Sequence, residues 1–301
     1  MQTDFPLLAF FGHHKCASTW IHRILGDFGR HAGLEHAYLY DETNFGGDLA
    51  GYVRSHGTQL ISYVNAETKH IGGLPPLRAF HVVRDPRDLL VSAYFSHLHS
   101  HPTKAWPELI PHRERLKSVS KTEGLILEVE FLDFAYNAMR DWDYDRPDTL
   151  ELRQEELTRA PYDGFLEIFR FLGVLDSADF DKSARLQHWR HVARNVAAER
   201  VPGLRGWHSP IRRFPAEPLL GIIYEHRFDK LAGGRSAGDE DVKSHYRKGT
   251  PGDWRNHFDA DVMAAFKARH GDLVTLLGYE ESDDWGLEDP TRESRPPVEM
   301  A

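Results

Sequence analysis

The strongest constraint on the fold is a short apolar segment that gives way to a helical pattern. The run PLLAFF at residues 6–11 is bounded by Pro6 and Gly12, as expected of a buried strand. Apolar residues then recur at helical spacing at Trp20, Ile21, Ile24, Leu25 and Phe28. The same strand and helix order returns at 78–83 and at 148–153. This alternation predicts an α/β fold, a central mainly parallel sheet flanked by helices.

The remaining segments predict one large domain. Residues 119–142 favour a single long helix, Gly173 is typical of a residue just past a helix end, and 259–277 predict a last helix ending at Gly278. We expect a single domain over 1–279, with a helical, arginine-rich insertion at about 176–225. The acidic, proline-bearing residues 280–301 favour a flexible tail.

Composition excludes several classes of protein. With 301 residues and 28% charged side chains, the sequence is typical of a globular protein, and no apolar run reaches the roughly 20 residues of a membrane span. The N-terminus lacks the pattern of a signal peptide, and the single cysteine excludes an internal disulfide, so we expect a cytoplasmic protein without membrane partners. A net charge of −9 argues against general nucleic-acid binding.

The insertion carries a local excess of positive charge. Between Arg185 and Arg213 there are seven arginines and one acidic residue, Glu199. Such a run is most often a solvated helical face. The alternative is a lid that faces an anionic cofactor or substrate.

The loop after the first predicted strand suits a phosphate. Backbone N–H groups at a helix N-terminus and the helix dipole favour an anion there, and Lys15, Ser18 and Thr19 add a charge and two hydroxyl donors. The lysine follows Gly12 by three residues and precedes the hydroxyl pair, so the loop is not a Walker A sequence. Ordinary helix capping explains the same residues equally well.

Two further loops are compatible with a phosphate. Arg84 ends the strand at 78–83, and Ser92 lies about two turns along the next helix, where both could grip an anion. Local capping pairs are the alternative there. In the third loop Arg247 and Lys248 precede Gly249, and the stretch is too basic and too glycine-rich for an ordinary connector.

These three stretches resemble the signatures of a known family. GHHKCASTW (12–20) resembles the 5′-phosphosulfate loop PKSGTTW of the cytosolic-type sulfotransferases, and VVRDPRDLLVSAYF (82–95) resembles their 3′-phosphate loop. YRKGTPGDWRNHF (246–258) resembles their C-terminal signature RKGxxGDWKNxF. The resemblance spans about residues 5–277. It implies a P-loop-like, three-layer α/β fold and 3′-phosphoadenosine 5′-phosphosulfate (PAPS) as sulfuryl donor.

The resemblance also implies roles for individual residues. The residues around the 5′-phosphosulfate would be Lys15, Cys16, Ala17, Ser18 and Thr19. The adenine would lie against Trp20 and Phe228, and the 3′-phosphate would be held by Arg84, Ser92, Arg247, Lys248 and Gly249. Lys15 would stabilise the charge that grows on the bridging oxygen as the sulfuryl group leaves. No metal is implied, because lysine, arginine and backbone amides supply the charge.

The sequence departs from the family pattern at the general base. The family's histidine should stand some twenty residues before Arg84, but ISYVNAE there contains none. His70, Glu67 or a histidine of YFSHLHSHP such as His101 are the candidates, and we take His70 and His101 as catalytic candidates. Gln154 also stands where the family often has an adenine-contacting tyrosine.

The sequence does not define the identity of the acceptor or the number of chains in the assembly. If the insertion is a lid, its arginines favour an anionic or carrier-bound small-molecule acceptor, and a homodimer is left open. Two other classes remain as alternatives, a P-loop kinase and a non-catalytic adenosine bisphosphate-binding protein.

Overall fold

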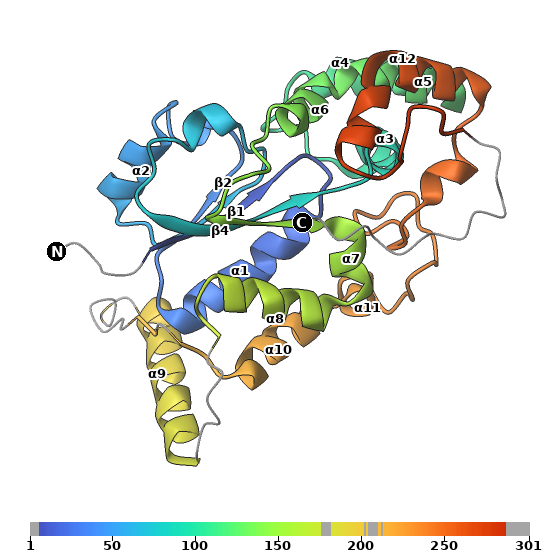
Figure 1. The fold of residues 1–301 in the computed structure, drawn as a ribbon. Coiled ribbons are helices and arrows are strands. Elements are labelled where there is room, and N and C mark those ends of the chain that lie inside the picture. The colour runs from blue at the N-terminus through green and yellow to red at the C-terminus, as the bar shows by residue number, and fades with distance from the viewer. Residues whose placement is uncertain (1–5, 176–181, 202, 204–209, 212, 287–301) are drawn as a thin grey trace. The chain divides into compact units, whose positions relative to one another are not determined.

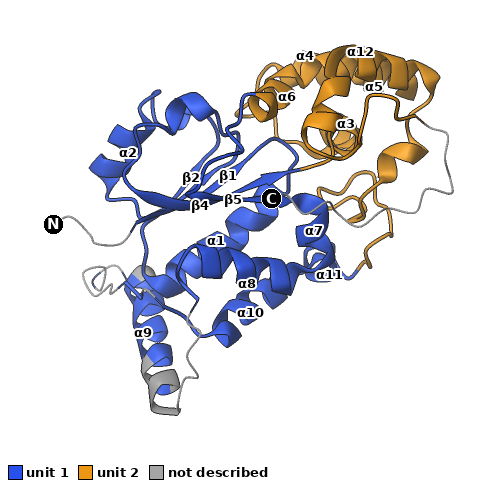
Figure 2. Cartoon of the chain, viewed as in Figure 1, with its two compact units in different colours: residues 1–83, 141–234 blue, residues 84–140, 235–301 orange. Residues whose placement is uncertain are grey.

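The structure is a computed structural model that describes residues 6–175, 182–201, 203, 210–211 and 213–286 (Figure 1). The chain divides into two compact units, each formed by two separate stretches of sequence (Figure 2). Unit 1 comprises Met1–Val83 and Asp141–Gly234, and unit 2 comprises Arg84–Arg140 and Arg235–Ala301.

Unit 1 is built on a five-stranded parallel sheet. Its strands are β1 (Leu7–Gly12), β2 (His36–Leu39), β3 (Leu60–Tyr63), β4 (Leu77–Val83) and β5 (Thr149–Arg153). Their order across the sheet is β2-β3-β1-β4-β5, and every pairing is parallel. The expected parallel α/β sheet is therefore confirmed. Strands β2 and β3 were not predicted from the sequence.

Strand β1 is buried on both sides because helices cover both faces of the sheet. Leu8 and Phe10 belong to one hydrophobic cluster, and Ala9 and Phe11 belong to a second, as the period of two in a strand requires. The first cluster takes in residues of α1 (Ser18–Ala32), α8 (Pro161–Phe171) and α10 (Ala216–Glu225). The second takes in residues of α2 (Leu49–His56), which lies on the other face (Figure 1).

The other described elements of unit 1 are short, with one exception. They are η1 (Glu42–Asn44), η2 (Thr68–His70), α7 (Gln154–Arg159), α9 (Lys182–Arg200) and α11 (Phe228–Leu231). The long helix α9 lies in the predicted arginine-rich insertion. Arg205 and Arg212, which belong to the same insertion, lie outside the described residues.

The described part of unit 2 is helical. Its elements are α3 (Pro86–Phe95), the π-helical turn η3 (Ser96–Ser100), α4 (Leu109–Ser118), α5 (Lys121–Phe131), α6 (Asp133–Arg140), η5 (Asp253–Asn256) and α12 (Ala260–Leu276). The single helix predicted for 119–142 is wrong, because the chain leaves helical geometry at Leu132. A capping box between Ser120 and Glu123 starts α5, and Asp133, at the start of α6, pairs with Arg269 of α12.

The folded chain continues beyond the predicted boundary at residue 280. Arg87, which is 2% exposed, pairs with Glu280 at 2.6 Å between Nη1 and Oε1. The Arg87 guanidinium also lies 4.8 Å from the centre of the Trp285 ring, and Trp285 is buried. Glu280 and Trp285 are thus packed in unit 2, whereas residues 281–284 and 286 are exposed, and residues 287–301 of the expected tail lie outside the described residues.

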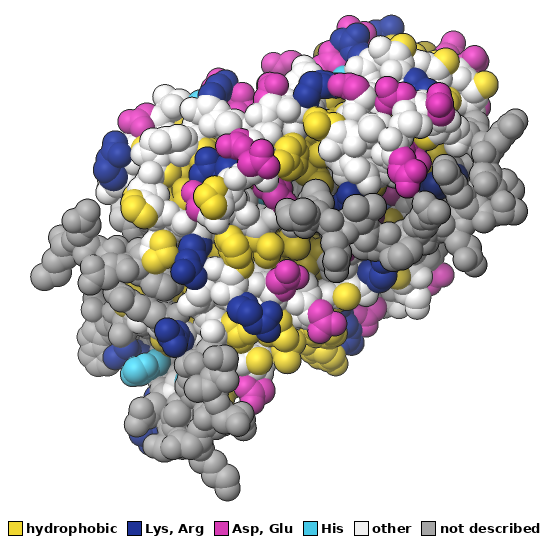
Figure 3. All heavy atoms as spheres, viewed as in Figure 1, with side chains coloured by type: hydrophobic (Ala, Val, Ile, Leu, Met, Phe, Trp, Pro, Cys, Tyr) yellow, Lys and Arg dark blue, Asp and Glu magenta, His cyan; other side chains and the backbone are white. Residues whose placement is uncertain are grey.

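The hydropathy of the helices and the charge on the surface complete the description of the fold. Among the described residues, no helix combines the length and the apolar character that crossing a bilayer requires. On the coloured part of the face in Figure 3, Asp and Glu side chains are interspersed with Lys and Arg. On that face the negative net charge is therefore spread out and does not form one acidic patch.

Candidate functional site

The loop between β1 and α1 has an unusual backbone. Lys15 has φ 64° and Ala17 has φ 61°, and both lie in the left-handed region that favours glycine. Ala17 is the N-cap of α1, and its carbonyl accepts hydrogen bonds from the N–H groups of Trp20 and Ile21. The family pattern PKSGTTW has glycine at the position of Ala17. Two strained residues in one short loop are typical of a ligand-binding segment.

Hydrogen bonds within the loop hold this conformation. The carbonyl of His13 accepts the Cys16 N–H at 3.1 Å and the Ser18 hydroxyl at 3.2 Å. Cys16 is fully buried, and its thiol lies 3.7 Å from the carbonyl of His14. Burial makes Cys16 a packing residue rather than an accessible nucleophile. Lys15 and Thr19 are half-buried at the N-terminus of α1, the end where a helix favours an anion.

Trp20 and the segment leading to Phe228 meet in unit 1. The indole N–H of Trp20 donates to the carbonyl of His226 at 2.8 Å, two residues before α11 begins at Phe228. His226 in turn lies 2.9 Å from the carboxylate of Asp27 on α1. The ring of Phe165 meets Trp20 edge-on at 5.3 Å. The structure therefore places Trp20 beside the segment that leads to Phe228, and the adenine-binding roles of both residues stay predictions.

A buried polar chain reaches the start of this loop, and the sequence analysis missed it. His13 Nε2 lies 2.8 Å from His81 Nε2, and His81 Nδ1 lies 2.5 Å from Glu151 Oε2. Glu151 Oε1 accepts the indole N–H of Trp142 at 2.9 Å. His81 and Glu151 are register partners on β4 and β5. The available signal was a histidine within AFHVV of β4 and a glutamate between the two leucines of β5.

Burial sets the protonation of this chain. It raises the pKa of Glu151 to about 7 and lowers the pKa of His81 to about 3. It also lowers the pKa of His13 well below its usual value, and His81 adds to that effect. A protonated Glu151 can donate to His81 Nδ1 while His81 Nε2–H donates to His13. In this arrangement His13, His81 and Glu151 are all neutral and each makes a hydrogen bond within the chain, whereas the buried Nδ1 of His13 has no hydrogen-bond partner among the described residues.

The catalytic candidate His70 lies in unit 1 on η2. Its Nε2 is 3.2 Å from the carboxylate of Glu42, and its ring meets Phe45 edge-on at 5.1 Å. The chain between β3 and η2 passes the phosphate-compatible loop, because the N–H of Ala66 donates to the carbonyl of Gly12 at 2.9 Å. The segment that carries Glu67 and His70 thus starts beside β1. Its role as base stays a prediction.

In unit 2, Asp88 joins the two other phosphate-compatible loops. Arg84 directly follows β4 in the sequence, and α3 then carries both Asp88 and Ser92. The buried carboxylate of Asp88 accepts the N–H groups of Gly252 at 2.5 Å and Trp254 at 2.9 Å. These bonds fasten the glycine-rich loop to the helix, so the structure brings together the segments predicted for a 3′-phosphate.

Arg247 and Lys248 converge on one buried carboxylate. Asp253 lies 2.6 Å from Arg247 Nη2 and 2.5 Å from Lys248 Nζ. Burial alone would raise the pKa of Asp253, but hydrogen bonds from His257, Lys248, Asn256 and Arg247 outweigh it and lower the pKa. The guanidinium of Arg247 also lies 4.7 Å from the ring of Phe95 at the end of α3. Both cations are therefore positioned before any ligand binds.

The remaining predicted residues of unit 2 lie beside these segments in the sequence. Gly249 has φ 72°, a conformation that suits glycine. His101 follows η3, and its Nδ1 lies 2.9 Å from the carbonyl of Pro102. This contact assigns Nδ1 as the donor nitrogen, so Nε2 is the nitrogen that could accept a proton. Its role as base stays a prediction.

The fold and these loops define a class: an α/β protein whose parallel sheet ends in a strained, anion-compatible strand–loop–helix turn. Comparison with solved structures finds similarity to sulfotransferases and to a retinol dehydratase. The mouse sulfotransferase SULT7A1 complexed with PAP is 14% identical over 90% of this chain and 86% of its own, with a TM-score of 0.46. Retinol dehydratase in complex with androsterone and PAP is 14% identical over 89% and 80%, with a TM-score of 0.42.

A third structure, the sulfotransferase domain from the Synechococcus PCC 7002 olefin synthase, is 13% identical over 61% of this chain and 78% of its own, with a TM-score of 0.34. No protein-family model and no curated protein matches the sequence. At these identities and TM-scores the similarities do not by themselves assign an activity to this chain.

Proposed function

We propose that this chain is a sulfotransferase that moves a sulfuryl group from PAPS to a hydroxyl or amine of a small-molecule or carrier-bound acceptor. The observation that carries the proposal is the loop after β1, where Lys15 and Ala17 hold left-handed conformations at the N-terminus of α1. Backbone strain of this kind is kept where it serves a ligand. The family signature quoted above assigns that ligand as the 5′-phosphosulfate.

The second observation that supports the proposal is the pair of cationic side chains held in place within unit 2. Arg247 and Lys248 are held by Asp253, and Asp88 fastens their loop to the helix that carries Ser92. Guanidinium and ammonium groups placed in advance suit a phosphate dianion such as the 3′-phosphate of the donor. The proposal keeps one sulfotransferase domain in the cytoplasm, extended past the predicted end at residue 279 because Glu280 and Trp285 pack against Arg87.

The proposed reaction is an in-line transfer. The acceptor oxygen or nitrogen forms a bond to sulfur while the bond from sulfur to the bridging oxygen breaks, and adenosine 3′,5′-bisphosphate leaves. Negative charge grows on the bridging oxygen, and we assign Lys15 to stabilise it. A base must take the acceptor proton, and His70 and His101 are the candidates, with Glu67 as the carboxylate alternative.

The test has a binding arm and a transfer arm. Adenosine 3′,5′-bisphosphate should raise the melting temperature of the wild-type chain, whereas ATP with Mg²⁺ should not. Lys15→Ala should lower sulfuryl transfer from PAPS about 10²- to 10³-fold, by analogy with the loss of an oxyanion donor. The exposed Lys117→Ala is the matched control and should keep wild-type rates. Stabilisation by ATP with Mg²⁺ instead would favour a kinase, and binding without transfer would favour the non-catalytic alternative.

The acceptor class is proposed from charge alone. Seven arginines between Arg185 and Arg213 favour an anionic acceptor, with residues 176–225 as its lid. Replacing Arg205, Arg212 and Arg213 by glutamine should raise the acceptor KM and weaken its dependence on salt. An unchanged KM and salt dependence would contradict the assignment of the lid.

A further inference from the structure

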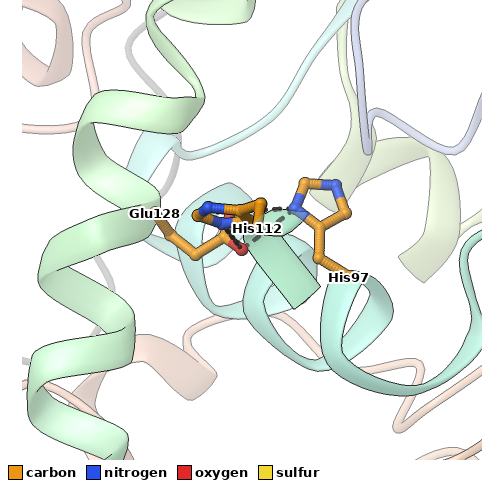
Figure 4. Close-up of side chains that lie close together, drawn as sticks. All are labelled: His97, His112 and Glu128. Carbon is orange, nitrogen blue, oxygen red and sulfur yellow. Dashed lines mark hydrogen bonds and ion pairs between the residues drawn. The ribbon is translucent and has the colours of Figure 1, made fainter. Parts of the chain in front are cut away.

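A second cluster of ionisable side chains lies in unit 2, and the proposed transfer does not use it. His97 on η3, His112 on α4 and Glu128 on α5 point toward one another (Figure 4). His97 Nδ1 lies 2.9 Å and 3.0 Å from the two carboxylate oxygens of Glu128. His112 Nε2 lies 2.9 Å from Glu128 Oε1. Three separate helical elements thus meet at one carboxylate.

Burial makes this cluster unlike a surface ion pair. The side chains of His97 and Glu128 are 0% exposed, and that of His112 is 9% exposed. The indole of Trp106 and the ring of Phe131 pack against His97, and Phe131 also stacks on His112 at 3.7 Å. An ionised carboxylate in such surroundings needs a strong compensating charge or good hydrogen bonds. Burial raises the pKa of Glu128, but the two histidines outweigh this and lower it.

Two other His and carboxylate clusters provide a contrast. In the cluster of Glu42, Glu67 and His70, both carboxylates pair with Lys69. The cluster of Glu240, Asp253 and His257 is likewise neutralised by Arg247 and Lys248. In both clusters, cationic Lys or Arg side chains therefore already balance the charge of the carboxylates.

Within the described residues, the ion-pair partners of Glu128 are the two imidazoles. The nearby Arg113 donates instead to the backbone carbonyls of His97 and His101. The charge of Glu128 is thus compensated by imidazoles, which are also common ligands of metal ions.

We propose that His97, His112 and Glu128 bind a divalent transition metal of the Zn²⁺ class. Two imidazoles and one carboxylate are a donor set that such metals prefer. The three ligand atoms lie within 4.8 Å of one another, and tetrahedral zinc at about 2.0–2.1 Å from nitrogen needs ligand atoms about 3.3 Å apart. Small side-chain movements therefore suffice. Water takes the fourth position.

The metal would replace two hydrogen bonds and tie three elements together. In the metal-free state each imidazole donates an N–H to Glu128. On binding, His97 Nδ1 and His112 Nε2 present lone pairs to the metal, and each proton moves to the other ring nitrogen. The site then joins η3, which continues the helix α3, to α4 and α5. The metal would stabilise unit 2, and none of its three ligands is among the residues proposed to bind the donor.

The test is metal binding by the full chain after chelator treatment and dialysis. Titration with Zn²⁺ in a calorimeter, with a competing chromogenic chelator, should show one tight equivalent. Glu128→Gln and His112→Gln should each weaken that affinity by more than about 100-fold, beyond the loss typical of an outer-shell partner. His70→Gln alters a similar cluster whose carboxylates pair with Lys69, and this variant should bind Zn²⁺ with the affinity of the wild type. Co²⁺ should give the visible absorption of a tetrahedral site in the wild-type chain and not in the two ligand variants.

Two results would overturn the proposal. One is a wild-type chain that takes up neither Zn²⁺ nor Co²⁺ after stripping. The other is Zn²⁺ binding with equal affinity in wild type and both ligand variants, which would place the metal on surface histidines. Far-UV circular dichroism shows whether each variant folds. His112→Gln, at the partly exposed ligand, keeps the test available if Glu128→Gln does not fold. None of these readouts depends on sulfuryl transfer.

Discussion

Replacing Glu151 by glutamine should remove a pH-dependent contribution to the stability of unit 1. Glutamine resembles the protonated glutamate, because its amide N–H₂ can donate to His81 Nδ1 while its carbonyl oxygen accepts from Trp142. Unlike glutamate, it cannot ionise. Glu151→Gln should therefore fold with nearly wild-type stability at pH 5, where Glu151 is mostly protonated in the folded chain.

The magnitude follows from the raised pKa. Burial raises the pKa of Glu151 from 4.5 to about 7, and each pH unit of difference corresponds to about 1.4 kcal/mol. Because the folded pKa is the higher one, this contribution to the free energy of unfolding is complete below pH 4.5 and is lost as the pH rises through 7. The wild-type chain should lose about 3 kcal/mol relative to Glu151→Gln between pH 4.5 and pH 8.5.

The assay is urea unfolding followed by tryptophan fluorescence at a series of pH values. The histidines that also titrate are present in both proteins, so the difference between the two free energies isolates Glu151. The exposed Glu35→Gln serves as control and should show no such pH-dependent difference. A difference between wild type and Glu151→Gln that stays constant from pH 5 to pH 8.5 would refute the neutral hydrogen-bonded chain.

Three further predictions concern stability and are measured by the same unfolding assay. Ala17→Gly should stabilise unit 1 by up to about 1 kcal/mol, because a non-glycine residue in the left-handed region costs roughly that much beyond glycine's larger unfolded-state entropy; a loss would contradict strain at that position. Asp88→Ala should cost unit 2 about 2–4 kcal/mol, since it leaves the buried N–H of Trp254 and the partly buried N–H of Gly252 without their acceptor. An unchanged midpoint would argue against that link. Burial lowers the pKa of His36 to about 4, so the stability that its neutral form contributes is lost as the pH falls below 6.5. Between pH 7 and pH 4.5, the free energy of unfolding of His36→Gln should therefore fall by about 2 kcal/mol less than that of the wild type. Parallel acid profiles of the two proteins would exclude this effect.

The long-range pairings explain what the sequence analysis did and did not find. The strand at 7–12 and the helix after it were predictable because a buried parallel strand is continuously apolar and a helix shows its own period. The four-residue strands β2 and β3 were not, because HAYL and LISY are too short to show a period. They become strands because β3 pairs with β1 and β2 pairs with β3.

The candidate site divides in the same way. The phosphate-compatible loops could be predicted because a lysine, arginines and glycines at strand and helix ends leave a local signature. Asp88 was not, because its partners Gly252 and Trp254 are more than 160 residues away in the sequence. The missing family histidine also left the base open between His70 and His101.

The sequence by itself determined the α/β class, the three anion-compatible loops and the residues from Lys15 to Trp20 that join the first strand to the first helix. These features depend on neighbouring residues, whose periodicity, charge and turn chemistry can be recognised locally. Only the tertiary structure decided that His13, His81 and Glu151 form one buried chain and that His97, His112 and Glu128 converge on a shared carboxylate. Those clusters depend on strand register and helix packing, which bring together side chains that are distant in the sequence.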